Sequence, residues 1–153
     1  MSRHRTLSGL LRELGRTLGV AHLELDDEGA CALSVDDRIV VHIAAAEPAG
    51  TAMLYAPLGT IQASRKAELH QRMLSANFVA AAQNLALSLD GEGMPVLLSH
   101  ARVENLSNAD FEQLVTRFVE VADGWVMELQ GPAAADAAEP VAVPFDRFAS
   151  MRA

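Results

Sequence analysis

Five histidines are the residues of this chain whose side chains bind metals most readily. No two of them stand at the short spacings, such as C-x-x-C or histidines four residues apart on a helix, that gather zinc ligands. We therefore expect no metal site, and we interpret His22 and His42 as half-exposed polar residues on strands that could be neighbours. The five are His4, His22, His42, His70 and His100.

Carboxylates and a single cysteine are the other candidates for chemistry. The groups at 26–28 and 36–37 lack the D-x-D-x-D-G order and the closing glutamate of a calcium loop, so we predict solvated hairpin turns. Cys31 stands between two alanines in an alternating segment with no cationic neighbour in sequence, which favours a small core residue over a nucleophile. One cysteine cannot form an intrachain disulfide, so a reducing cytoplasm is the expected location.

Motifs of the common enzyme classes are missing from the sequence. It has no G-x-S-x-G, no phosphate-binding glycine loop and no G-x-G-x-x-G after a strand. An enzyme could still assemble its site from distant residues, but the sequence predicts neither catalysis nor a cofactor.

Composition and charge exclude further classes of protein. The 153 residues suit one domain, and 12 basic against 20 acidic residues give a formal charge of −8, which disfavours nucleic acid as a partner. Arg12, Glu13 and Arg16 interrupt the first apolar segment before it could serve as a signal peptide. No run approaches the roughly 18 apolar residues of a membrane span, so no membrane partner is expected.

The periodicity of apolar residues predicts an α+β fold. Leucines at helical spacing predict a helix over 7–18 that ends at Gly19, and alternation predicts strands near 23–25, 31–35, 38–44 and 51–58. A long helix over about 64–84, strands over 85–89 and 95–103, and a last helix with a capping box from Ser107 to Asp110 follow. Three helices should pack on one antiparallel sheet in the order α-β-β-β(-β)-α-β-β-α. Residues 1–130 form the predicted domain, and residues 131–153 form an Ala/Pro-rich flexible tail.

The long helix is predicted to be apolar on two sides, although a helix needs only one apolar stripe to pack on its own domain. This surplus predicts a second protein surface that covers it. Asn77 lies between the stripes, and it could contact that partner or, as we favour, bond to a nearby loop as a buried amide. The first stripe is Leu69, Met73, Ala76 and Ala80, and the second contains Leu74 and Phe78.

Four segments together resemble the class I chaperones of bacterial type III secretion, the CesT-like group. They are "LLRELGRTLGV", "LELDDEGACALSVDDRIVVHI", "RMLSANFVAAAQNLALSLD" and "DFEQLVTRFVEVADGWVMEL". The resemblance covers about residues 7–130 in the order typical of the family. It implies a cytoplasmic homodimer that binds the extended N-terminal segment of an effector, keeps that segment partly unfolded for secretion, and needs no ATP itself.

The resemblance also implies where the partners bind. In such chaperones the second helix meets its copy across a two-fold axis, so one or other stripe of the 64–84 helix, from Leu69 to Ala80, would be the dimer interface. The effector would lie in apolar grooves of the first helix and the meander, and could add a strand to a sheet edge. About half of the groove candidates must be plain core. They are Leu11, Leu14, Leu18, Leu23, Leu25, Leu33 and Val35.

Two other functions stay open at this level. A dimer of the same fold could hold a folded partner as a regulatory or scaffolding protein, and an enzyme would need a deep cleft with convergent titratable groups. The sequence does not decide whether the tail contacts the secretion ATPase.

Overall fold

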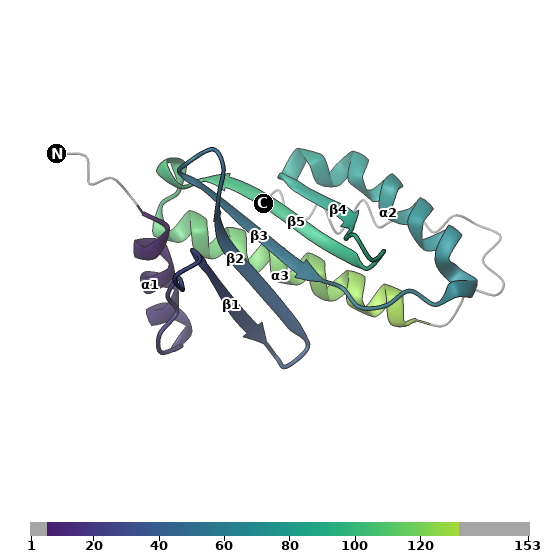
Figure 1. The fold of residues 1–153 in the computed structure, drawn as a ribbon, viewed down its shortest axis with the longest axis horizontal. Coiled ribbons are helices and arrows are strands. Elements are labelled where there is room, and N and C mark those ends of the chain that lie inside the picture. Colours follow the sequence, from purple (N-terminus) through teal and green to yellow (C-terminus); the bar gives the residue numbers. More distant parts are fainter. Residues whose placement is uncertain (1–5, 132–153) are drawn as a thin grey trace.

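The computed structural model describes residues 6–131, so residues 1–5 and almost all of the predicted tail lie outside the described residues. The elements follow the predicted order with three strands before the second long helix (Figure 1). Short 3₁₀ turns flank the second long helix at 63–65 and 81–83 and precede the third at 103–105. The long elements are α1 (Leu7–Leu18), β1 (Ala30–Val35), β2 (Ile39–Ala46), β3 (Thr51–Pro57), α2 (Lys66–Ala80), β4 (Leu85–Leu89), β5 (Pro95–Arg102) and α3 (Asn108–Gln130).

The helix ends agree with the sequence signals. Thr6 accepts a hydrogen bond from the Gly9 N–H (3.1 Å) at the start of α1, and Gly19 takes the left-handed conformation (φ 67°) after its end. Ser107 and Asp110 form the predicted capping box of α3.

All five strands form one antiparallel sheet in the order β1-β2-β3-β5-β4, so β1 and β4 are its edges. Alternate residues of each strand point to opposite faces. On one face Val41, Ile43 and Leu54 are fully buried, and α3 crosses behind this face with α1 beside it (Figure 1). From α3 the large buried side chains are Phe111, Phe118, Trp125 and Leu129. The core therefore lies between the sheet and these two helices, and the buried residues of α2 join the same cluster.

Two turns, one before β1 and one between β4 and β5, repeat one hydrogen-bond pattern. The Asp26 carboxylate accepts from the N–H groups of Glu28 (2.9 Å) and Ala30 (3.0 Å), and the Asp26 N–H donates to the Ala30 carbonyl (2.8 Å). Asp90 makes the same three contacts with Glu92 and Met94. In both turns, the first acidic residue organises backbone N–H groups. The predicted hairpin forms at 36–37, between β1 and β2, whereas the turn at 26–28 is preceded by no strand among the described residues and is not a hairpin.

The predicted strand at 23–25 does not form. His22 has a positive φ of 62°, an unfavourable conformation for a strand residue, and it is exposed. Leu23 instead packs towards α1, where a Cβ added to Gly15 would lie 3.2 Å from the Leu23 Cβ. The close approach that Gly15 permits draws this segment to the helix rather than along β1. The placement of His22 on a strand is therefore corrected.

Candidate protein-binding surfaces

The two apolar stripes of α2 have opposite surroundings. The stripe of Leu69, Met73, Ala76 and Ala80 is buried within the subunit, where α2 packs beside β4. On the other stripe, Leu74 is 72% exposed and Phe78 is 89% exposed. The stripe that the subunit leaves uncovered is thus the one containing Leu74 and Phe78.

Asn77, between these stripes, bonds to the edge strand β4. Its Nδ2 donates to the Leu87 carbonyl (2.9 Å), and its Oδ1 accepts from the Leu87 N–H (2.7 Å). The sequence predicted an amide bonded to a loop, whereas the partner is a strand. Because both Leu87 backbone groups point away from β5, Asn77 occupies the middle of the free β4 edge.

A buried arginine joins the start of α2 to the end of α3. The Arg65 side chain is only 3% exposed, and its Nη1 donates to the carbonyls of Glu128 (3.1 Å) and Gly131 (2.8 Å). Carbonyls at a helix C-terminus lack intrahelical partners. The Arg65 guanidinium donates hydrogen bonds to them and interacts favourably with the negative end of the helix dipole. Arg65 also donates a hydrogen bond to the Glu68 carboxylate, and Arg72 forms ion pairs with both Glu68 and Glu128.

One row of residues crosses the sheet on the face opposite α3. The strand registers place these residues side by side from edge to edge, and the rings of His42 and Tyr55 stack with centroids 4.6 Å apart. None of them is fully buried, and no described helix covers this side in Figure 1. We name this set the open-face row: Ala32, His42, Tyr55, Leu98 and Ala86.

The β1 edge has backbone groups without described partners at adjacent outward-facing positions. The Ala45 N–H donates to the Gly29 carbonyl (2.9 Å), so the odd-numbered residues of β1 bond to β2 and the even-numbered ones point away. The outward groups of Ala30 are bonded to Asp26. Ala32 and Ser34 therefore present the open part of this edge.

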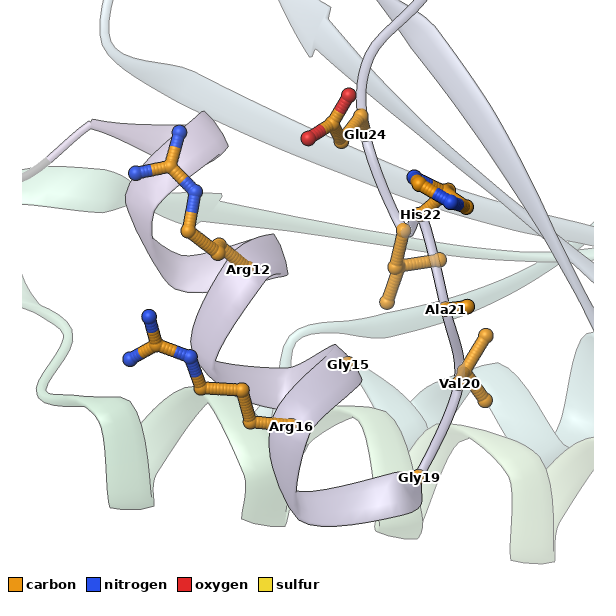
Figure 2. A pocket seen from close by; sticks show the side chains of 9 residues that line it. Arg12, Gly15, Arg16, Gly19, Val20, Ala21, His22 and Glu24 are labelled. Carbon is orange, nitrogen blue, oxygen red and sulfur yellow. The ribbon is translucent and has the colours of Figure 1, made fainter.

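A pocket of about 370 Å³ lies between α1 and the segment that follows it (Figure 2). Gly15 lies beside Val20, because a Cβ added to Gly15 would be 3.0 Å from the Val20 carbonyl oxygen. In Figure 2 the side chains of Arg12 and Arg16 extend from the side of α1 that faces away from this segment. Val20 lines the opposite wall and, like Leu18 near the helix end, is exposed. The pocket is thus lined by charged and polar side chains, His22 and Glu24 among them, together with small apolar groups.

The predicted groove residues divide between core and surface. Leu18 is 49% exposed, and Leu25 and Val35 are partly buried against the core. The remaining four belong to the hydrophobic core of the subunit: Leu11, Leu14, Leu23 and Leu33.

Several residues of these surfaces were not singled out from the sequence. Arg65 could have been recognised from Glu68 three residues and Arg72 seven residues later, a spacing that places all three on one side of a helix. The open-face row has no such signal, because its members come from five strands whose registers are known only from the fold.

Three further observations concern Cys31, metal-ligating residues and membrane-spanning helices. Burial, with a smaller contribution from Asp26, raises the pKa of the Cys31 thiol, which lowers its thiolate fraction. Within residues 6–131 no three metal-ligating side chains come together. No helix in the same range is long and apolar enough to cross a membrane.

The chain matches a known family of chaperones. The Tir chaperone protein (CesT) family model matches residues 9–126, and the chain belongs to this family. The resemblance found in the sequence is thereby confirmed. No individual curated protein matches the chain.

Three solved structures illustrate the similarity. The chain matches one from the ExsC-ExsE complex with a TM-score of 0.71 and 21% identity, covering 88% of this chain and 100% of that one. It matches the HopA1-SchA chaperone-effector complex with a TM-score of 0.64 and 19% identity, covering 76% and 90%. For the Yersinia pestis type III secretion chaperone SycH in complex with a fragment of YscM2, the TM-score is 0.61 and the identity 21%, covering 78% and 99%. At these identities the likeness shows the shared fold.

Proposed function

We propose that this protein is a cytoplasmic chaperone that binds the extended N-terminal segment of a type III secretion effector, keeps it soluble and partly unfolded, and promotes its secretion. The observation that carries the proposal is the open β1 edge at Ala32 and Ser34, which adjoins the open-face row. Family membership supports the same function.

The open edge explains how a client of little defined sequence would bind. An extended segment that pairs with Ala32 and Ser34 gains main-chain hydrogen bonds whatever its side chains are. Its side chains on the open face would continue the row towards His42 and Tyr55, and these contacts would supply selectivity. Of the predicted groove residues, Leu18, Leu25 and Val35 would contact the client, while the four buried leucines support the groove from beneath.

A homodimer through α2 is the second part of the proposal. Leu74 and Phe78 form an exposed apolar stripe that a two-fold axis would bury against its own copy. Asn77 already occupies the β4 edge beside α2, so the contact would be made by α2 side chains rather than by a continuous sheet. The other predicted interface residues, Leu69, Met73, Ala76 and Ala80, would hold α2 in place from below.

We propose no catalysis, no ATP hydrolysis and no cofactor for this chaperone. Binding by strand addition and apolar contact needs none of them. The raised pKa of Cys31 argues against a nucleophilic thiol. Contact with the secretion ATPase stays a prediction of the family resemblance.

Co-expression tests the proposal. The chain should be produced with the N-terminal segments of secreted proteins encoded beside it, purified, and digested briefly with a protease. We expect one such segment to co-purify and to be protected from digestion. Tyr55→Asp, which places a charge in the open-face row, should reduce capture at least about tenfold, since desolvating a charge in an apolar contact is costly.

Met127→Asp is the matched control, because Met127 is an exposed apolar residue of α3, away from the row. It should capture the client normally. Equal capture by both variants would remove the open face from the binding site, and the absence of any protected segment would contradict the function itself.

A further inference from the structure

The open part of the β1 edge is bounded by an acidic residue at each end. The Asp26 N–H donates to the Ala30 carbonyl (2.8 Å), and the Asp26 carboxylate accepts from the Ala30 N–H (3.0 Å). These are the two backbone groups that an added strand would need at Ala30. At the other end Asp36 begins the turn that follows β1, with a positive φ of 52°. An added segment therefore pairs only with Ala32 and Ser34, and it passes an acidic turn on either side.

The two turns carry negative charge that the subunit does not neutralise. The turn at 26–28 contains three carboxylates and the turn at 36–37 contains two, and all five residues are exposed. Among residues 6–131, the ion pairs of the structure include none of these carboxylates. Arg38, the next residue after the second turn, is paired instead with Asp123 of α3 (3.0 Å). The open edge thus lies between two sites of unpaired negative charge.

The distance between the two turns sets the spacing of charges on a segment that would complement them. A strand rises about 3.3 Å per residue, so the six positions from Ala30 to Asp36 span about 20 Å. Basic residues six positions apart on an extended segment are about the same distance from each other. The side chains that β1 places on the open face at this edge are small, namely Ala30, Ala32 and Ser34. They leave room for the long apolar stem of a lysine or arginine to lie across the strand and reach a carboxylate.

We propose that the β1 edge selects extended effector segments in which two lysines or arginines, about six positions apart, flank a short stretch of β-branched or apolar residues. This inference rests on the proposed function and names the chemistry of its client. Backbone hydrogen bonds at Ala32 and Ser34 would hold the segment, and the turns at 26–28 and 36–37 would select it by charge. Because both turns are acidic, the requirement is the same whichever way the segment runs. Exposed ion pairs are weak and are screened by salt, so the charges would supply selectivity and a salt-dependent affinity.

Three synthetic peptides test this selectivity without an effector. The first is Lys-Thr-Val-Thr-Val-Thr-Lys with both ends capped, and in the other two glutamine or glutamate replaces both lysines. Each peptide is titrated into the full chain labelled with ¹⁵N, and the NMR shifts of the Ala32 and Ser34 amides report binding. At about 50 mM salt we expect the lysine peptide to bind at least about tenfold more tightly than the glutamate peptide. At about 0.5 M salt the ratio should fall below about threefold, because the charges are screened.

Charge-neutralising variants show whether the two turns are responsible. Asp36→Asn combined with Asp37→Asn should weaken binding of the lysine peptide at least about threefold. Asparagine tolerates a positive φ, so the turn should keep its conformation. Asp27→Asn combined with Glu28→Gln should cause a similar loss from the other end, and neither side chain that it changes takes part in the hydrogen bonds of Asp26.

Glu92→Gln combined with Glu120→Gln is the matched control. It also removes two exposed carboxylates, one from the β4–β5 turn and one from α3. Binding of the lysine peptide should stay within about twofold of that to the unchanged chain, because both sites lie away from the β1 edge. An equal loss in this control would show a general attraction to the acidic chain and would overturn the proposal.

Two further results would overturn it as well: equal affinity for the three peptides, or no shift of the Ala32 and Ser34 amides with any of them. The proposed function would survive these results if an effector segment were still captured and protected in co-expression. Selective binding of the lysine peptide without capture of any effector segment would contradict the function and support the charge selectivity of the edge.

Discussion

The Asn77 side chain pairs with both backbone groups of Leu87: it donates to the Leu87 carbonyl (2.9 Å) and accepts from the Leu87 N–H (2.7 Å). The β4 edge is therefore blocked at its central residue, whereas Ala32 and Ser34 of the β1 edge have no described backbone partner. This asymmetry directs strand addition to β1. It also tethers α2, which carries the exposed stripe of Leu74 and Phe78, to the sheet.

Replacing Asn77 tests this tether. Asn77→Ala should lower the free energy of unfolding by about 1–3 kcal/mol, because it leaves two backbone groups of Leu87 without their partner. Urea denaturation of the protein measures the change. Ser75→Ala, at an exposed position of the same helix, should stay within about 0.5 kcal/mol of the unchanged protein. A loss for Asn77→Ala no larger than this control would show that water replaces the amide at no cost.

The two stripes of α2 should respond differently to a charge. Phe78→Asp should give a folded monomer, because its side chain is almost fully exposed in the subunit and contacts only the proposed partner. Met73→Asp should unfold the protein, because it buries a charge without a partner and costs about 4 kcal/mol or more. Circular dichroism and light scattering separate these outcomes. A folded dimer of Phe78→Asp would exclude this stripe as the interface.

Arg65 should contribute more to the stability of the fold than an exposed arginine does, because its side chain is buried. Arg65→Met keeps much of the apolar stem but leaves the Glu128 and Gly131 carbonyls without a donor, and should cost about 1.5–3 kcal/mol. Thermal unfolding provides the measurement. Arg16→Met removes an exposed pair with Glu13 and should cost less than about 1 kcal/mol. If both variants melted at the same temperature, the buried contacts of Arg65 would contribute no net stability.

Glu68 should make stability depend on acid pH. Hydrogen bonding to Arg65, together with the charges of Arg65 and Arg72, lowers its pKa below the ordinary value of 4.5, against a smaller opposing effect of desolvation. A depressed carboxyl pKa adds stability that is present above the unfolded-state pKa and is lost as pH falls through the folded-state value. The free energy of unfolding should therefore fall below about pH 4.5, and it should fall less steeply in Glu68→Gln. Parallel pH profiles for the two proteins would contradict this assignment.

Local chemistry explains how much of the fold could be predicted. The capping box of Ser107 and Asp110, and the turns at Asp26 and Asp90, depend on residues a few positions apart, so their patterns are visible in the sequence. The prediction of a strand at 23–25 was wrong. Alternation of apolar and polar residues indicates a half-buried segment, but it does not tell whether that segment pairs with β1 or packs on α1. Gly15, eight residues earlier, decides between them by allowing Leu23 to approach the helix.

The binding surfaces were harder to predict, because the periodicity of apolar residues indicates which side of a helix is apolar but not which element packs against it. The sequence predicted that α2 has two apolar sides, yet only the packing of β4 shows that Met73 is covered and Phe78 is not. Leu11 and Leu18 belong to one helical stripe, but Leu11 is fully buried whereas Leu18, the last residue of α1, is 49% exposed. The open-face row depends on the registers of five strands, which no local pattern encodes.

The central claim is that one subunit leaves apolar surface for a second copy and an effector segment to cover. Size-exclusion chromatography with light scattering of the co-expressed complex tests it most directly. We predict a mass of two 16.3 kDa chains plus the bound effector segment, and two such chains when the effector is left out. A stable 16.3 kDa species that neither pairs nor retains an effector segment would contradict the account.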